Sequence, residues 1–217
     1  MKPVILAALK QELAPLQRII PPNVARFVRT GVGPRRAAAA VRERCRDADL
    51  IISTGCCGGL VPGADRGMLA IPARVVQLAS GEPVDAPAPD AGLAAQARGV
   101  AERLGLHCSP RPLVTVEDAL HTPQSKRRCH EACGAVVVDM ETTAIAGAAR
   151  DIDVPYVSIR VVLDTADETL PRVPRGLVEA ARRPGEMLTL AALALRLRSI
   201  SADLGGCIAA LLHELGC

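Results

Sequence analysis

Short runs of β-branched and aliphatic residues alternate along the chain with Ala-rich segments whose apolar residues recur every three or four positions. The runs are typical of strands buried on both faces, and the segments between them have the period of helices that pack on a sheet. The pattern predicts an α/β fold, with a central, mostly parallel, twisted sheet between two layers of helices. We expect strands near 3–9, 24–30, 50–53, 67–78, 111–116, 135–138 and 154–163, and helices over 11–20, 35–46, 93–104 and 142–150.

The stretch 136–167 contains the strongest candidates for functional side chains. Its first strand ends in Asp139-Met140-Glu141, a helix follows, and its second strand ends at Asp164. Strand, helix and strand in this order predict a βαβ-like unit, and ligands of open α/β sheets bind outside the carboxyl ends of the strands. Glu141 and Asp164 are therefore candidates to face one ligand, although acids at such positions also cap helices or lie in solvated loops.

Glycine-rich turns follow two other predicted strands. Gly31-Val32-Gly33-Pro34 precedes a helix, as an anion-binding loop does, and the following Arg35 and Arg36 suit either a phosphate or a solvated helix face. Thr54 to Leu60 holds three glycines, which allow a ligand to approach the backbone closely. The segment 81–90, with three prolines, is expected to be a surface loop.

Composition narrows the class of protein. The chain of 217 residues is long enough for one domain, 1–217, with a sizeable core. Its net charge of +3 is nearly balanced, and aromatic residues make up 1%, which leaves almost no surface for base stacking. We therefore expect no nucleic-acid partner.

The eight cysteines do not predict a disulfide framework. The apolar start is short and is followed by Lys10 and Glu12, so no signal peptide is expected and the protein is predicted to be cytoplasmic, where disulfides are rare. Cys129-His130-x-x-Cys133 has half of a metal-ligand spacing without a second pair, so no metal is expected. A nucleophilic cysteine at 56–57 is an alternative, but no histidine is recognisable as its base.

Two sequence blocks carry a resemblance to a known family. VDMETTAIA at 138–146 and VPYVSIRVVLDTAD at 154–167 resemble the signature of the nucleoside phosphorylase superfamily, on the methylthioadenosine/S-adenosylhomocysteine nucleosidase branch. Weaker matches extend over most of 1–170. The resemblance implies a phosphorylase/hydrolase-like three-layer αβα sandwich, a homodimer, no cofactor, and cleavage of the N-glycosidic bond of a small-molecule adenine nucleoside.

The same resemblance implies roles for individual residues. Glu12 matches the acid that activates water, and Asp164 the acid that protonates or hydrogen-bonds N7 of the leaving base. Glu141 would accept the ribose hydroxyls while Met140 packs on the sugar. Cysteines replace the family's small polar residue, and a leucine stands where the branch has an aromatic. The further substrate contacts implied are Cys56, Cys57, Gly58, Leu120 and His121, and the phosphate or nucleophile site is bordered by Gly33 and Arg35. Inorganic phosphate stays open as a co-substrate.

The tail is similar to the hopanoid-associated phosphorylase branch. Leu170-Pro171 and Arg182-Arg183-Pro184-Gly185 precede apolar helices expected within 177–215. This similarity implies adenosylhopane as substrate, with release of adenine, and a peripheral contact with the inner face of a membrane. The helices are too short to span a bilayer, and packing on the core or on a second subunit is the alternative.

Two other functions stay open. One is a methylthioadenosine/S-adenosylhomocysteine or futalosine-type nucleosidase, and the other, of a different class, is a non-catalytic purine-binding module. A dinucleotide-dependent dehydrogenase is disfavoured because the chain has no Gly-x-Gly-x-x-Gly motif.

Overall fold

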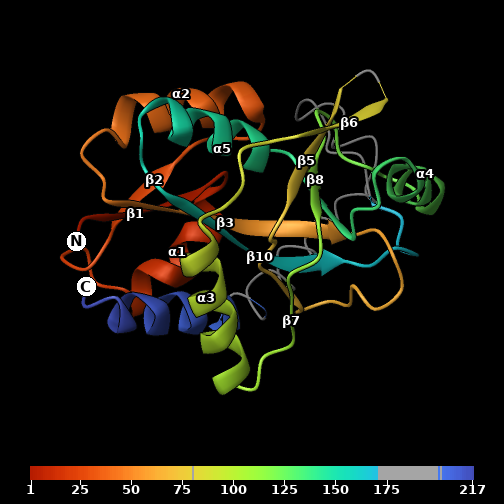
Figure 1. Ribbon diagram of the computed structural model, residues 1–217. Helices are drawn as coiled ribbons and strands as arrows, with labels where there is room; N and C mark the ends of the chain where they lie inside the picture. The colour runs from red at the N-terminus through yellow and green to blue at the C-terminus, as the bar shows by residue number, and fades with distance from the viewer. Residues whose placement is uncertain (80, 171–199, 201) are drawn as a thin grey trace, which may run out of the picture.

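The computed structural model describes residues 1–79, 81–170, 200 and 202–217 and has three layers (Figure 1). Helices α2 (Pro34–Arg44) and α5 (Thr142–Asp151) cover one face of the sheet. Helices α1 (Lys10–Ile19) and α3 (Ala91–Arg103) cover the other face, together with a helix over 202–214. The predicted αβα sandwich is confirmed.

The sheet is mixed and centred on one long strand, β3. Its order is β6-β5-β8-β9-β3-β10-β4-β7, and β1 pairs with both β2 and β3. Six strand pairings among the described residues are parallel and three are antiparallel, so the sheet is mostly parallel as predicted. The strands are β1 (Pro3–Ala7), β2 (Arg26–Arg29), β3 (Leu50–Gly59), β4 (Leu69–Ala70), β5 (Val75–Ala79), β6 (Glu82–Asp85), β7 (Cys108–Ser109), β8 (Leu113–Thr115), β9 (Val137–Asp139) and β10 (Tyr156–Asp164).

Alternation along the central strands builds both halves of the core. In β1, Ile5 packs with α1, α3 and the 202–214 helix, whereas its neighbours Val4 and Leu6 pack with α2 and α5. Ile52 and Ile51 of β3 divide between the two faces in the same way. Successive side chains of a strand point to opposite faces, so a strand covered on both sides must be apolar throughout. This is why these strands were recognisable from continuous apolar runs.

The expected βαβ-like unit is wrong in its pairing. β10 runs parallel to β3, but β9 runs antiparallel to the end of β3, so β9 and β10 flank this strand instead of forming a parallel pair. The reason is the length of β3, which continues past the end of β1 and meets β9 only at Gly58 and Gly59. Glu141 and Asp164 still line one cavity, because β10 ends beside Gly58 and β9 runs back from Gly59 along the other edge of β3.

Two further expectations are corrected. The strand expected over 67–78, with a break at Pro72, is two separate strands, because the chain crosses at Pro72 from β4, beside β10, to β5, beside β8. The loop expected over 81–90 contains β6, which pairs antiparallel with β5. All four residues of β6 are exposed, and one of them is Pro83, as edge strands allow, so this strand lacks the apolar alternation that would reveal it.

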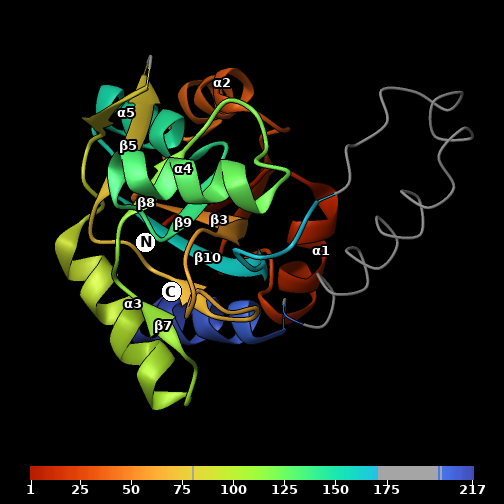
Figure 2. The ribbon, with the colours of Figure 1, turned by 90° about the vertical axis from the view of Figure 1, so that its right-hand side faces the viewer.

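Helix α4 (Pro123–Cys133) was not predicted, and it lies at the end of the molecule that faces the viewer in Figure 2. Of the apolar segment expected over 177–215, residues 177–199 and 201 lie outside the described residues, as do Pro171 and Arg182–Gly185. Its last part is the 202–214 helix, which buries Leu204, Ile208 and Leu211 in the core. None of the described helices is long and apolar enough to cross a membrane.

Candidate active site

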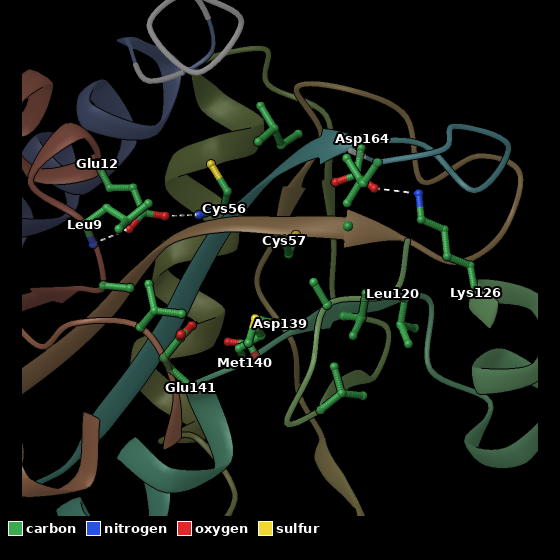
Figure 3. A pocket seen from close by; sticks show the side chains of 18 residues that line it. Leu9, Glu12, Cys56, Cys57, Leu120, Lys126, Asp139, Met140, Glu141 and Asp164 are labelled. Carbon is green, nitrogen blue, oxygen red and sulfur yellow. Dashed lines mark hydrogen bonds and ion pairs between the residues drawn. The ribbon is translucent and has the colours of Figure 1, made fainter. Parts of the chain in front are cut away.

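The site opens where the sheet divides. One edge of β3 pairs with β1 at 50–53 and with β9 at 58–59, and within the described chain no strand pairs with 54–57 on that edge. A cavity of about 210 Å³ lies beside this gap (Figure 3). It brings together eight of the predicted site residues, from five segments of the chain: Glu12, Cys56, Cys57, Gly58, Leu120, Met140, Glu141 and Asp164.

Glu12 is a buried carboxylate held by two backbone N–H groups. The N–H of Leu9 donates to Oε2 at 2.8 Å, which also caps the start of α1, and the N–H of Cys56 donates to Oε1 at 2.9 Å. Gly55 makes this approach possible, since its φ is +130° and an added Cβ would lie 2.6 Å from Oε1. One position of the Glu12 side chain thus both caps the start of α1 and places the carboxylate in the cavity wall.

Glu141 is held in a similar way by the Gly-Val-Gly turn. The N–H of Gly33 donates to Oε1 at 2.9 Å, and Nη1 of Arg160 lies 3.9 Å from Oε2. Burial raises the pKa of Glu141, and the charge of Arg160 opposes that rise. The amide that was expected to border phosphate therefore binds a carboxylate that faces the cavity.

A buried ion pair, missed in the sequence, supports the Asp139–Glu141 segment. Nη2 of Arg160, in β10, forms an ion pair with Oδ2 of Asp139 at 2.9 Å and donates a hydrogen bond to Oγ of Ser53 at 3.0 Å. Asp139 also accepts from the Thr115 hydroxyl at 2.7 Å. Buried charges require partners, so an arginine inside an apolar strand was the available signal for a buried acid nearby.

Asp164 lies at the end of β10 and is 4% exposed. Its Oδ2 accepts from Nζ of Lys126 at 2.5 Å, and both side chains line the cavity (Figure 3). Burial raises the pKa of Asp164 and the Lys126 ammonium opposes that rise. Asp164 is therefore a carboxyl group whose protonated form is favoured by burial, as a proton donor requires.

The two cysteines lack the properties of a nucleophile. Burial raises the pKa of both the Cys56 and the Cys57 thiol, so both are protonated near neutral pH. The reactive form of a cysteine is the thiolate. This disfavours covalent catalysis at 56–57 and leaves these residues as part of the cavity wall. The eight cysteines of the chain are all free.

Three predicted residues, Gly33, His121 and Arg35, lie outside the cavity lining. The carbonyl of His121 accepts from the N–H of Leu170, while its buried Nδ1 has no hydrogen-bond partner among the described residues. Arg35 is exposed on α2.

Two apolar side chains at one side of the cavity are partly exposed to solvent: Leu9 is 42% exposed and Val32 is 44% exposed. The described residues contain no group of three or more metal-ligating side chains.

A family model identifies the family of the chain. The model described as the phosphorylase superfamily matches residues 23–193, which is well over half of the chain. The chain belongs to this superfamily. Family and site together indicate an enzyme that cleaves an N-glycosidic bond.

Solved structures of the same fold include two nucleosidases and a hydrolase. The 5′-methylthioadenosine/S-adenosylhomocysteine nucleosidase of Helicobacter pylori matches with a TM-score of 0.78 and 14% identity, covering 99% of this chain and 98% of that one. The nucleosidase of Neisseria meningitidis, in complex with methylthio-immucillin-A, has a TM-score of 0.73, 21% identity and coverages of 96% and 99%. A futalosine hydrolase mutant of Helicobacter pylori matches with a TM-score of 0.75 and 16% identity, covering 96% of this chain and 98% of that one.

Proposed function

We propose that this protein is a nucleosidase that hydrolyses the N-glycosidic bond of an adenine nucleoside bearing an apolar 5′ substituent, with adenosylhopane as the specific candidate. The observation that carries the proposal is the convergence of Glu12, Glu141 and Asp164 on one cavity. Breaking an N-glycosidic bond makes the sugar carbon cationic and the base anionic. Carboxylates beside the sugar stabilise the first charge, and an acid beside the base neutralises the second.

Each acid has a part in this reaction that its surroundings support. Glu141, beside Met140, accepts hydrogen bonds from the ribose hydroxyls and adds negative charge near the sugar. Glu12, fixed by the N–H groups of Leu9 and Cys56, orients water and takes its proton. Asp164 gives a proton to N7 of adenine as the bond to the sugar breaks.

Water is favoured over phosphate as the nucleophile. The N–H groups of Cys56 and Gly33, which a phosphate would need, already donate to Glu12 and Glu141. Lys126 is the one cation among the cavity-lining residues of the described chain, and it donates to Asp164 and two carbonyls. A phosphate dianion would also lie between carboxylates, which repel it.

The apolar 5′ substituent is supported by the side of the cavity at Leu9 and Val32. Both side chains are partly exposed, so an apolar group that leaves the cavity there would cover them. Leu170, which also lines the cavity, belongs to the tail segment that is similar to hopanoid-associated phosphorylases. The homodimer, the cytoplasmic location and the peripheral membrane contact stay predictions.

The test is adenine release from adenosylhopane, methylthioadenosine and S-adenosylhomocysteine, each with and without phosphate. We expect release from adenosylhopane, weaker release from methylthioadenosine, and no dependence on phosphate. Release from methylthioadenosine or S-adenosylhomocysteine alone would identify a salvage nucleosidase, and a requirement for phosphate would identify a phosphorylase. Purine binding without any release would support the non-catalytic module.

A further inference from the structure

Lys126 is buried near the N-terminus of α4, a place that disfavours a positive charge. The helix dipole repels a cation there, and burial of an ammonium is costly unless it is fully paired. Its side chain is 1% exposed, and its Nζ donates to Oδ2 of Asp164 at 2.5 Å, to the carbonyl of Thr165 at 2.6 Å and to the carbonyl of Glu168 at 3.0 Å. All three partners belong to the end of β10 and the turn that follows it.

These bonds fix the orientation of the Asp164 carboxyl group. Figure 3 shows one oxygen directed at Lys126 and the other pointing away from it, toward the side of the cavity where Cys56 and Cys57 lie. Gly58 lets the carboxyl lie flat against β3, since an added Cβ would be 3.1 Å from Oδ2 and 3.4 Å from Oδ1. The two oxygens therefore have different environments.

The difference determines where a proton can reside. An ammonium group has donors and no acceptor, so the oxygen that it contacts must accept. A proton on the Asp164 carboxyl is then directed to Oδ1, the oxygen on the cavity side. Without Lys126 the proton would distribute between both oxygens and the carboxyl would be free to rotate.

We propose that Lys126 is the positioning residue of the leaving-group acid: it keeps the acidic proton of Asp164 on Oδ1, facing the base, and pairs with the carboxylate that forms when the proton leaves. In this step the Oδ1–H bond breaks and an N7–H bond forms, while the electrons of the C–N bond move into the base. The inference rests on the proposed function, because it assigns Asp164 the role of acid.

The other charged groups around Asp164 largely offset one another. Glu168, in the turn after β10, forms an ion pair with Arg66, which precedes β4. On the β3 side are the protonated thiols of Cys56 and Cys57. Lys126 is thus the charge in direct contact with Asp164, and its removal should change the behaviour of that acid.

The first experiment compares Lys126→Met with Arg127→Met, an exposed position on the same helix. For adenine release we expect Lys126→Met to lower kcat about 100-fold with little change in KM, at the low end of what a general acid contributes, and Arg127→Met to have no effect. A nitrophenyl riboside, whose leaving group departs without a proton, should be cleaved by Lys126→Met at nearly the wild-type rate. Equal losses on both substrates would overturn the proposal.

Two further variants separate positioning from folding. Lys126→Arg keeps the charge and should recover most of kcat. In an Asp164→Asn background, Lys126→Met should cause no additional loss, since the acid that it positions is already absent. An additional loss of similar size there would show that Lys126 acts by another route.

A titration independent of turnover completes the test. With Lys126→Met, the pKa of Asp164, followed by carbon NMR of its carboxyl, should rise by about one unit or more, because an adjacent cation is removed. An unchanged value would overturn the inference. If the wild-type protein releases no adenine from any nucleoside, the proposed function fails, and this titration still decides whether Lys126 controls Asp164.

Discussion

The two ends of the cavity, which we propose hold the sugar and the base of the substrate, fix their carboxylates by different means. At the sugar end, Glu12 and Glu141 accept hydrogen bonds from backbone N–H groups of Leu9, Cys56 and Gly33. At the base end, Asp164 is paired with the side chain of Lys126, which comes from a separate helix. Backbone amides cannot rotate or dissociate independently of the fold, whereas the position of the Lys126 side chain depends on how α4 packs.

This difference matches the chemistry that each end must perform. A carboxylate that stabilises a cationic sugar, the part proposed for Glu141, acts through a fixed position and a permanent charge. A proton donor must change its charge in every turnover, and the ammonium of Lys126 remains beside it before and after. Backbone amides thus suit the constant charge proposed for Glu141, and the Lys126 ammonium suits the proton transfer proposed for Asp164.

The largest effect should come from Asp164→Asn, which keeps the shape of the base end and removes its acid. We expect kcat for adenine release to fall by about 10²–10⁴-fold, the range of general acid catalysis. The pH dependence should change as well. In the wild type, kcat should fall as pH rises through the raised pKa of Asp164, because only the protonated carboxyl supplies the proton. The variant should lose this pH dependence. Turnover near the wild-type level would remove Asp164 from the chemistry.

A smaller loss should follow Glu141→Gln at the sugar end. The amide oxygen can still accept from the Gly33 N–H, but one acceptor and the negative charge near the sugar are lost. Hydrogen bonds to a charged group contribute about 1.5–3 kcal/mol, so kcat/KM should fall about 10- to 150-fold. Preference for ribose over 2′-deoxyribose should weaken in parallel. Glu43→Gln, exposed on α2, is the control, and an unchanged sugar preference in Glu141→Gln would contradict the assignment.

Part of this site could be predicted from the sequence. Glu141 and Asp164 follow from local patterns, since each stands at the end of a predicted buried strand, whereas the site role of Glu12 came only from the family resemblance. The fold class follows from apolar runs and helical periodicity. The direction of β9 did not follow, because a strand of three residues carries no information about its partner, which the curl of the sheet around β3 determines.

Lys126 is the clearest case of a residue that local pattern could not assign. It is distant from Asp164 in the sequence, and of the residues in α4 only Lys126 and Cys129 are buried, so the helix has no apolar stripe. The usable signal was the start of the helix, where Thr122 and Ser125 form a capping box around Pro123. That signal predicts the helix but not the contact of its lysine.

A third, weaker perturbation tests the backbone frame of the sugar end. In Gly55→Ala the new Cβ would lie 2.6 Å from Oε1 of Glu12, so the carboxylate must move, and we expect kcat to fall about tenfold. Gly63→Ala is a matched control, because its φ is +87° but nothing lies within 4 Å of the added Cβ. Both variants should lose about 1–3 kcal/mol of stability from backbone strain, measured by denaturant unfolding. Full kcat in Gly55→Ala would show that the position of Glu12 is not critical.

The smallest effect should be confined to the 5′ substituent. Leu9→Ala removes apolar surface at the cavity while leaving the backbone N–H that holds Glu12. A half-buried leucine contributes about 1 kcal/mol of contact with an apolar group, so KM for a nucleoside with an apolar 5′ substituent should rise about fivefold. KM for adenosine, which carries only a 5′ hydroxyl, should not change, and Leu104→Ala, similarly exposed at the end of α3, should affect neither substrate. An equal rise for both nucleosides would place Leu9 at the sugar or the base, and the apolar preference would then have to arise elsewhere in the chain.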